Sequence, residues 1–498
     1  MKYIKISIVI LLVSFISIFA YKLTTNNSNN KISLTKEQMK EMLSYTIDGN
    51  STSSMPTKGS GYKVKSITCK NGSILSWDND NWLLEVEKLE SEDLCNIDFT
   101  TGTGSYTVTV VPSIAGSLDS TSKTTTENGT VTFYTDAIID SVSGCTNEIS
   151  DGKIIIKNVT GNTTCNINVS YMKLYDKLLA DNPTRSTRDT YNAVFINNTT
   201  GTLFTATEKN VHNTTDTTVY YYAGNTTNNW VKFAGYYWRI IRTNADGSIR
   251  MLYSGTSHDT TSGYINSTTY AFNTSYNSPK YVGYMYGEND DTLANARTNT
   301  NNSTIKTAID NWYASNMTSY TKYLSTTAVY CNDRTEQTSG TYNIGSKFGY
   351  APRARVNTNY APTYDCTETS DAFSGSNTSA KLTYPIALMT VDEIMRAGGK
   401  DRTSLTSPYA WYYLNSANGS ITGSEWWWLL SPNDWDDVGD AGVFSVYGSS
   451  TPGRLSYSYV DGRGGVRPAV SLKSCVKTSG GDGSANAPYT IEESTSGC

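Results

Sequence analysis

Histidine is almost absent from this chain, which has only His212 and His258 among its 498 residues. Two isolated histidines exclude histidine-rich metal centres and most histidine-based catalytic triads. Charged residues are also scarce, because Asp, Glu, Lys and Arg together make up 17% of the chain and leave a net charge of −5. This balance provides no basic surface to hold nucleic acid, so we expect no nucleic-acid partner.

Cysteine is sparse as well, and none of the eight cysteines forms the Cys-x-x-Cys pair that would indicate a zinc or redox site. Their number is even and all of them follow the apolar N-terminal segment, a pattern typical of structural disulfides in an exported protein. Eight cysteines allow about 105 pairings. Pairing of sequence neighbours would close local loops worth about 3 kcal/mol each. The expected pairs are Cys69 with Cys95, Cys145 with Cys165, Cys331 with Cys366, and Cys475 with Cys498.

An apolar run at residues 6–21 follows Lys2 and Lys5, as in an export signal. Residues 18–20 make a poor cleavage site, so we expect residues 1–23 to be an uncleaved signal anchor, with a cleaved signal peptide as the alternative. The chain would then contact its own cell membrane through residues 6–21 as a single-pass protein, or be secreted if cleaved. In both cases the C-terminal part lies outside the cell.

Aromatic residues are plentiful, with 37 Tyr and 10 Trp, so the chain can form packed cores and general disorder is excluded. Short alternating segments between turn residues predict an α+β, mostly β protein. We expect a helix at residues 32–48 with Thr35 as its N-cap, inside a helix-and-linker segment 24–60. The other expected parts are small β-sandwich or β-grasp modules at 61–102 and 105–171, a connector at 172–224, a large domain at 225–475 and a disulfide-pinned tail at 476–498.

The second small module contains the motifs Ser122–Thr124, Asn128–Val131, Ser143–Cys145 and Asn158–Thr160. Through these motifs it resembles the internalin-type B-repeat modules of bacterial surface proteins. The resemblance implies a spacer or weak adhesion module. A plain disulfide-pinned stalk is the alternative.

The large domain alternates strand and helix patterns. Residues 230–242 and 248–253 are predicted strands joined at the turn Asp246-Gly247. A helix is expected at 303–315, with Ile305, Ala308, Ile309 and Trp312 on one face. Residues 384–399 predict a strand, an N-cap at Thr390, a short helix and a glycine stop.

The C-terminal motifs are Trp411–Leu414, Glu425–Pro432 and Gly465–Leu472, with a tail motif at 481–489. In this order they resemble the C-type-lectin-like fold shared by formylglycine-generating-enzyme-like domains and the variable proteins of diversity-generating retroelements. Residues 390–399 and 441–446 are similar to that family as well. The resemblance implies a rigid platform that presents a ligand-binding hairpin.

The segment between Pro432 and Gly465 is rich in Tyr, Asp, Ser, Gly and Arg, a composition that binding loops favour. In the resembled variable proteins this stretch is the diversified binding surface. The resemblance assigns ligand binding to Asn433, Asp434, Trp435, Asp436, Asp437, Asp440, Ser445, Tyr447, Arg454, Ser456, Tyr457, Tyr459, Asp461 and Arg463. We expect the affinity to rest on Trp435, Tyr447, Tyr457 and Tyr459.

Several expectations accompany this binding face. Along a strand Trp426 and Trp428 would share one side and Trp427 the other, and at least two of them would pack in the core. Arg467 is expected to pair with Asp392 or Glu393. Asp434, Asp436, Asp437 and Asp440 could hold Ca²⁺, although a solvated acidic turn is the simpler interpretation and we assign no metal.

The sequence therefore predicts an exported, non-catalytic protein without a cofactor, whose partner is an unknown extracellular protein or glycan. One alternative is an oxidoreductase of the formylglycine-generating type, but the cysteines do not lie in its motif. Another is a structural surface protein that has no dedicated ligand, with a solvated hairpin in place of the binding face.

Overall fold

The computed structural model describes residues 41–58, 60–78, 81–101, 105–259, 263–337, 341–413, 426–436, 438–448, 451–494 and 497–498. The expected signal anchor at 1–23 and the N-cap Thr35 lie outside these residues. The chain divides between Ser170 and Tyr171 into two compact units. Within the described ranges no helix is long and apolar enough to cross a membrane.

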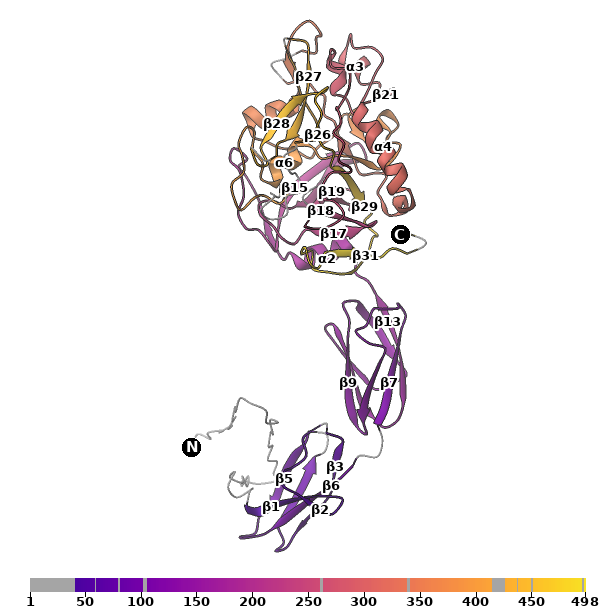
Figure 1. The fold of residues 1–498 in the computed structure, drawn as a ribbon, viewed down its shortest axis with the longest axis vertical. Helices are drawn as coiled ribbons and strands as arrows, with labels where there is room; N and C mark the ends of the chain where they lie inside the picture. The colour runs from indigo at the N-terminus through magenta and orange to yellow at the C-terminus, as the bar shows by residue number, and fades with distance from the viewer. Residues whose placement is uncertain are drawn as a thin grey trace. The chain divides into compact units, whose positions relative to one another are not determined.

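The first module is built on a sheet in the order β2-β1-β6-β3 (Figure 1). Strand β1 runs parallel to β6, pairing Leu43 with Cys95 and Ile47 with Phe99. The helix expected at 32–48 is therefore wrong for residues 43–47, because their alternating side chains add a strand to this core. The hairpin β4–β5 packs Trp77 and Trp82 against Phe99. The strands are β1 (Leu43–Ile47), β2 (Asn50–Thr52), β3 (Tyr62–Cys69), β4 (Ile74–Asp78), β5 (Leu83–Lys88) and β6 (Cys95–Thr101).

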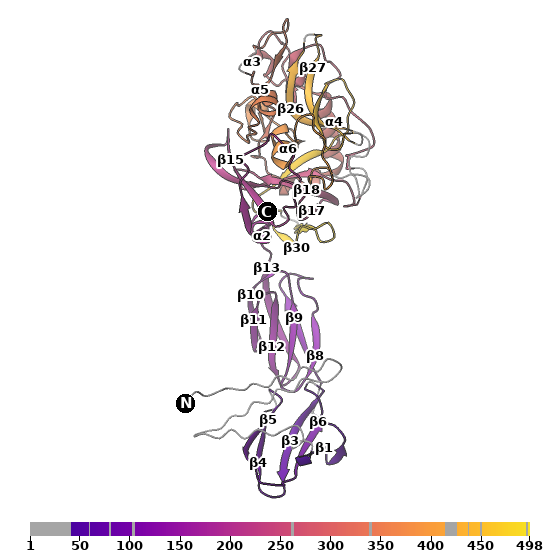
Figure 2. The same ribbon diagram turned by 90° about the vertical axis from the view of Figure 1, so that its left-hand side faces the viewer.

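The second module has two sheets, in the orders β10-β13-β7-β8 and β11-β12-β9 (Figure 2). Every second residue of β13 is buried, as alternation along a half-buried strand predicts. The strands are β7 (Ser105–Pro112), β8 (Ser122–Thr126), β9 (Gly129–Tyr134), β10 (Ile138–Ser143), β11 (Asn147–Ser150), β12 (Lys153–Val159) and β13 (Thr163–Ser170).

The large unit contains a ten-stranded sheet whose main path is β14-β15-β16-β18-β17-β31-β30, with β19, β29 and β25 branching from β18. Residues 172–224, expected as a connector, supply three of these strands, and the expected tail 476–498 supplies β30 and β31. The strands are β14 (Thr184–Ser186), β15 (Thr202–Asn210), β16 (Asn213–Tyr221), β17 (Trp230–Phe233), β18 (Tyr236–Thr243), β19 (Ile249–Tyr253), β25 (Ile386–Leu388), β29 (Pro468–Leu472), β30 (Thr478–Gly480) and β31 (Tyr489–Ile491).

The predicted single strand at 230–242 is divided into β17 and β18. Ala234 and Gly235 both have positive φ angles, 54° and 78°, and form the tight turn between them. The predicted hairpin across Asp246-Gly247 is present as β18 and β19, in which Thr243 pairs with Ile249.

Five α-helices occur among the described residues of this unit: α2 (Leu174–Asp181), α3 (Leu293–Ala296), α4 (Thr304–Asn316), α5 (Ala351–Ala354) and α6 (Val391–Ala397). The side chain of Ser303 caps α4, which buries Ile305, Ile309 and Tyr313, whereas Ala308 and Trp312 are only half-buried. Thr390 and Glu393 form the capping box of α6, and Gly398 ends this helix. In Figures 1 and 2, α6 lies between the ten-stranded sheet and the strands β26 and β27.

A second sheet, in the order β23-β26-β27-β28, carries the predicted binding hairpin. Its strands are β23 (Phe348–Gly349), β26 (Trp427–Trp435), β27 (Ala441–Val446) and β28 (Leu455–Tyr459). Short pairs complete the unit: β20 (Met285–Tyr286) with β21 (Asn301–Asn302), and β22 (Tyr330–Cys331) with β24 (Ala372–Phe373).

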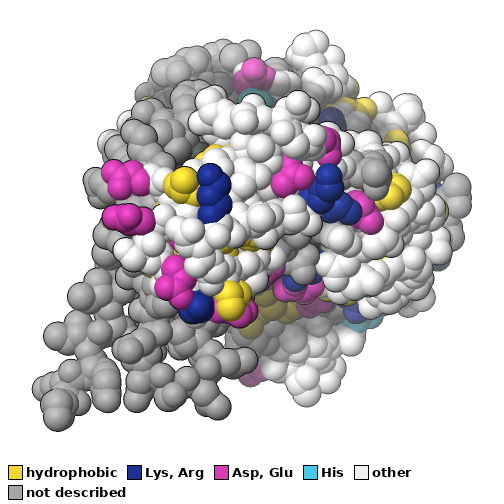
Figure 3. All heavy atoms as spheres, turned by 90° about the horizontal axis from the view of Figure 1, so that it is seen from below, with side chains coloured by type: hydrophobic (Ala, Val, Ile, Leu, Met, Phe, Trp, Pro, Cys, Tyr) yellow, Lys and Arg dark blue, Asp and Glu magenta, His cyan; other side chains and the backbone are white. Residues whose placement is uncertain are grey.

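All four predicted disulfides are formed: Cys69–Cys95, Cys145–Cys165, Cys331–Cys366 and Cys475–Cys498. Each disulfide joins two successive cysteines of the sequence, and both lie in the same module or in the large unit. The face drawn in Figure 3 shows a small number of acidic and basic side chains among a larger area of backbone and uncharged side chains, as the low charge content predicts.

Candidate binding face on the C-terminal hairpin

The platform of the predicted hairpin is rigidly packed, because every residue of β26 and β27 is buried. The rings of Trp426 and Trp428 meet at 4.6 Å, whereas Trp427 faces the guanidinium of Arg467 at 4.8 Å. The predicted alternation of the three tryptophans is therefore confirmed, as is the core position of Trp427 and Trp428. Val443, Phe444, Val446, Leu455 and Val460 complete the buried apolar set.

Arg467 does not pair with a carboxylate, contrary to expectation. Its guanidinium donates to the carbonyl oxygens of Tyr253 and Tyr412, at 3.2 and 2.9 Å. The two expected partners are engaged elsewhere, since Asp392 binds Arg355 and Glu393 binds Arg242 and Arg250. Carbonyls at the ends of neighbouring segments thus satisfy this buried cation.

The outer strand β28 carries the exposed part of the predicted site. Its pairing with β27 sets Phe444 opposite Tyr457 and Ser445 opposite Ser456. Because side chains alternate along a strand, Tyr457 and Tyr459 lie on one face, and Ser456 and Ser458 lie on the other. The predicted binding residues are therefore distributed over both faces of the hairpin and do not form the single surface that the sequence predicts.

Four of the predicted binding residues are buried: Asn433, Asp434, Trp435 and Ser445. Their contribution to affinity through direct contact, expected above all for Trp435, is not supported. For Trp435 and Asp434 the reason is β23, which pairs Phe348 with Trp435 and Gly349 with Asp434 and so covers the end of β26. The half-buried or exposed members are Asp436, Asp440, Tyr447, Arg454, Ser456, Tyr457, Tyr459, Asp461 and Arg463, and Asp437 lies outside the described residues.

Acidic side chains surround Tyr459 at one end of β28. A hydrogen bond to Asp436 raises the pKa of the Tyr459 hydroxyl, because deprotonation would place two anions side by side. Partial burial, followed by the charges of Asp436 and Asp461, raises the pKa of Asp440. Asp436 also accepts the backbone N–H groups of Val438 and Asp440, both at 3.0 Å. This end of the hairpin is therefore electronegative.

On the opposite face, Tyr447 stacks on Trp426 with ring centroids 6.1 Å apart and planes 14° apart. Arg454 covers the Tyr447 ring at 5.0 Å, and the Tyr447 hydroxyl lies 3.4 Å from Ser458 Oγ. Trp426 is the half-buried member of the tryptophan triplet. This face therefore carries half-buried aromatic rings together with hydroxyl groups.

Residues from distant segments border the hairpin, and sequence reasoning missed them. Arg353 of α5 lies 3.2 Å from Asp434, whose carboxylate rests over Gly442. Arg402 donates its backbone N–H to the Leu455 carbonyl at 2.9 Å, and its side chain is 68% exposed. No local pattern in the sequence signals these contacts, because they depend on the pairing of segments dozens of residues apart.

The large unit also contains a buried ionic cluster that fixes α6. Arg242 binds Glu208 at 2.6 Å and Glu393 at 3.0 Å, and Arg250 binds Glu393 at 2.7 Å. Burial opposes ionisation, yet the charges of Arg250 and Arg242 hold the pKa of Glu393 below its ordinary value. The adjoining cavity measures about 20 Å³, room for roughly one water molecule and no larger ligand. This cluster is structural.

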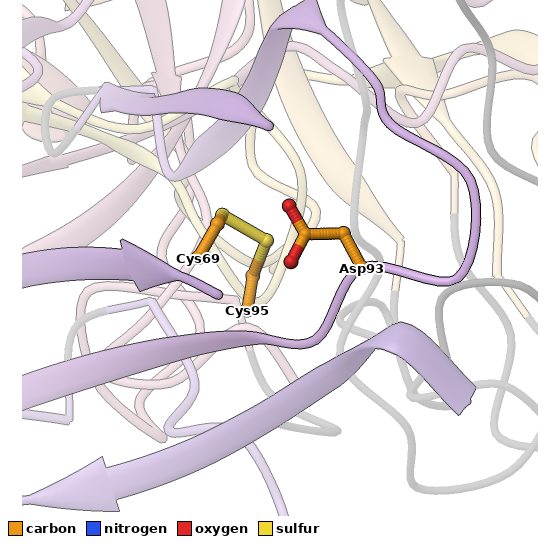
Figure 4. Close-up of side chains that lie close together, drawn as sticks. All are labelled: Cys69, Asp93 and Cys95. Carbon is orange, nitrogen blue, oxygen red and sulfur yellow. A yellow bond between two sulfur atoms is a disulfide. The ribbon is translucent and has the colours of Figure 1, made fainter. Parts of the chain in front are cut away.

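One group of potential metal ligands occurs among the described residues, formed by Cys69, Asp93 and Cys95 (Figure 4). Its two sulfur atoms are joined in a disulfide, so neither is a thiolate ligand. Asp93 instead accepts the backbone N–H groups of Asn71 and Ser73, at 2.6 and 2.7 Å. Hydrogen bonding thus explains this carboxylate without an ion.

The chain was compared with protein-family models, curated proteins and solved structures, and none of them matches it.

Proposed function

We propose that this protein is an exported cell-surface protein that binds an extracellular ligand through its C-terminal hairpin, on a platform of the C-type-lectin-like kind. The observation that carries the proposal is the contrast between β28 and the strands beneath it. Tyr459 is 38% exposed and Tyr457 is half-buried, whereas every residue of β26 and β27 is buried. Accessible tyrosines on a rigid support lose little entropy on binding.

Two features of the surroundings also support binding. The two ends of β28 carry opposite charges, with acidic groups around Tyr459 and arginines beside Leu455. Opposite charges at the two ends select the orientation in which a ligand binds. Four disulfides, all between sequence neighbours, suit a protein that works outside the cell. A signal anchor at residues 1–23 would hold the protein at the membrane.

The competing oxidoreductase hypothesis requires a reactive thiol pair, and no cysteine of this chain is free. The Nε2 atom of His212 lies 2.9 Å from the wholly buried Ser374 hydroxyl and 3.3 Å from the Ser376 hydroxyl, which donates its hydrogen bond to the Thr326 carbonyl at 2.9 Å. These observations favour the binding function over the enzymatic one.

The test is a screen of the full chain against arrays of glycans and extracellular proteins. We expect specific signals that the Tyr457→Ala/Tyr459→Ala variant loses, with a cost of about 2 kcal/mol for a central tyrosine. Tyr134→Ala is the matched control, because it removes a tyrosine that is 55% exposed on the second module. Signals that survive in the double variant, or no signal at all, would contradict the proposal.

A further inference from the structure

Strand β28 is an edge strand, and part of its outer edge carries backbone groups without a partner. Tyr447 N–H donates to the Arg454 carbonyl, and Val460 N–H to the Ala441 carbonyl, both at 2.9 Å. In an antiparallel ladder hydrogen-bonded pairs alternate, so the backbone groups of Ser456 and Ser458 face β27. Those of Tyr457 and Tyr459 consequently point away from the sheet.

Neighbouring segments occupy the two ends of this outer edge. The Leu455 carbonyl accepts from Arg402 N–H, and the Tyr459 carbonyl accepts from Gly462 N–H, both at 2.9 Å. Between them, no residue that the structure describes partners the Tyr457 N–H, the Tyr457 carbonyl or the Tyr459 N–H. Such unpaired groups are a template for another extended chain.

The distribution of side chains fits the same interpretation. A strand added beside β28 would direct alternate side chains to the two faces of the sheet. One set would meet Tyr457 and Tyr459, and the other would meet Ser456, Ser458 and Tyr447. A ligand lying flat on one face would reach only one of these two sets.

The charges at the two ends specify the ligand further. Arg402 and Arg454 flank Leu455, and the carboxylate of Asp401 lies 3.7 Å from Arg402. Asp436, Asp440 and Asp461 gather near Tyr459. A complementary ligand therefore carries acidic groups toward Leu455 and basic groups toward Tyr459.

Building on the binding function argued above, we infer that the ligand is an extended peptide segment of a partner protein that adds as a strand to β28 at Tyr457–Tyr459. Backbone hydrogen bonds supply part of the affinity, and the side chains on both faces supply selectivity. The acidic end of the peptide lies toward Leu455 and its basic end toward Tyr459.

The probe is a phage-displayed library of ten-residue peptides, with Glu-Glu fixed at one end, Lys-Lys at the other and the central positions random, selected on the full chain. The best peptide is synthesised in three forms: unmodified, N-methylated at every central amide, and with Glu-Glu at both ends. We expect N-methylation to abolish binding, because it blocks backbone pairing while keeping the side chains. The second acidic end should weaken binding about tenfold through repulsion by Asp436, Asp440 and Asp461.

A pair of variants isolates the protein backbone. Tyr457→Pro and Tyr457→Val both remove the ring, but only proline removes the outward N–H, which β27 does not use. We expect Tyr457→Pro to bind the selected peptide about tenfold more weakly than Tyr457→Val, the effect of one lost hydrogen bond in a dry interface. Equal tryptophan fluorescence and urea midpoints would establish that both variants fold.

The outcomes separate this inference from the function on which it rests. Equal affinities of the two variants, or an N-methylated peptide that still binds, would overturn the added strand. Glycans that bind in a Tyr457- and Tyr459-dependent manner, with no peptide selected, would also overturn it while leaving the binding function intact. Failure of peptides, glycans and extracellular proteins alike to bind would contradict both the added strand and the binding function.

Discussion

Replacing Glu393 with glutamine tests whether the buried ionic cluster holds the large unit together. The substitution keeps the size of the side chain and an acceptor for the Thr390 N–H, which now lies 2.9 Å away. It removes the negative charge opposite Arg242 and Arg250. Arg242 keeps Glu208, but Arg250 is left with the Val329 carbonyl and the face of the Tyr330 ring.

An uncompensated buried charge costs about 3–5 kcal/mol, so we expect Glu393→Gln to lose that much free energy of unfolding. Urea is the appropriate denaturant, because it does not screen charges as guanidinium does. Tryptophan fluorescence reports mainly on the large unit, since only Trp77 and Trp82 of the ten tryptophans precede it. The expected result is a lower urea midpoint with an unchanged slope.

The matched control is Asp216→Asn, which breaks an exposed ion pair with Lys209 at 3.7 Å. Pairs of this kind contribute about 0.5 kcal/mol or less, because water screens them. A loss below about 1 kcal/mol in Glu393→Gln would refute the reasoning, since it would mean that solvent or rearrangement compensates the two arginines.

Two further predictions concern the same helix. The pKa of Glu393 is lowered in the folded protein, so its stabilising contribution is present above its ordinary pKa of 4.5 and is lost as the pH falls through the lower pKa of the folded state. The urea midpoint should therefore drop in acid less steeply in Glu393→Gln than in the parent protein. Parallel pH profiles of the two proteins would contradict this prediction. Thr390→Ala removes the hydroxyl that accepts the Glu393 N–H at 3.2 Å and should lower the free energy of unfolding, measured in urea, by about 1 kcal/mol. Thr390→Ser keeps a hydroxyl and should retain most of that free energy. A Ser variant as unstable as the Ala variant would argue against the cap.

Features that depend on near neighbours in the chain were predictable from the sequence. The alternation of Trp426, Trp427 and Trp428 follows from the two-residue repeat of a strand. The N-cap at Thr390 follows from the residue preferences at helix starts, and the four disulfides join cysteines that are adjacent in the sequence order. Each of these features rests on local geometry or short loop closure.

Features that depend on distant segments were decided by the tertiary structure. Residues 43–47 are a strand because β6 offers them a partner, although the helical pattern of the preceding residues predicted that the helix would continue through them. Trp435 and Asp434 are buried because β23, more than eighty residues earlier, covers them. The middle of the outer edge of β28 stays open because Arg402 and Gly462 donate hydrogen bonds only to its two ends. The burial of a side chain and the pairing of a strand edge depend on which residues lie nearby in space. Those neighbours come from distant parts of the chain, so they are known only once the complete fold is known.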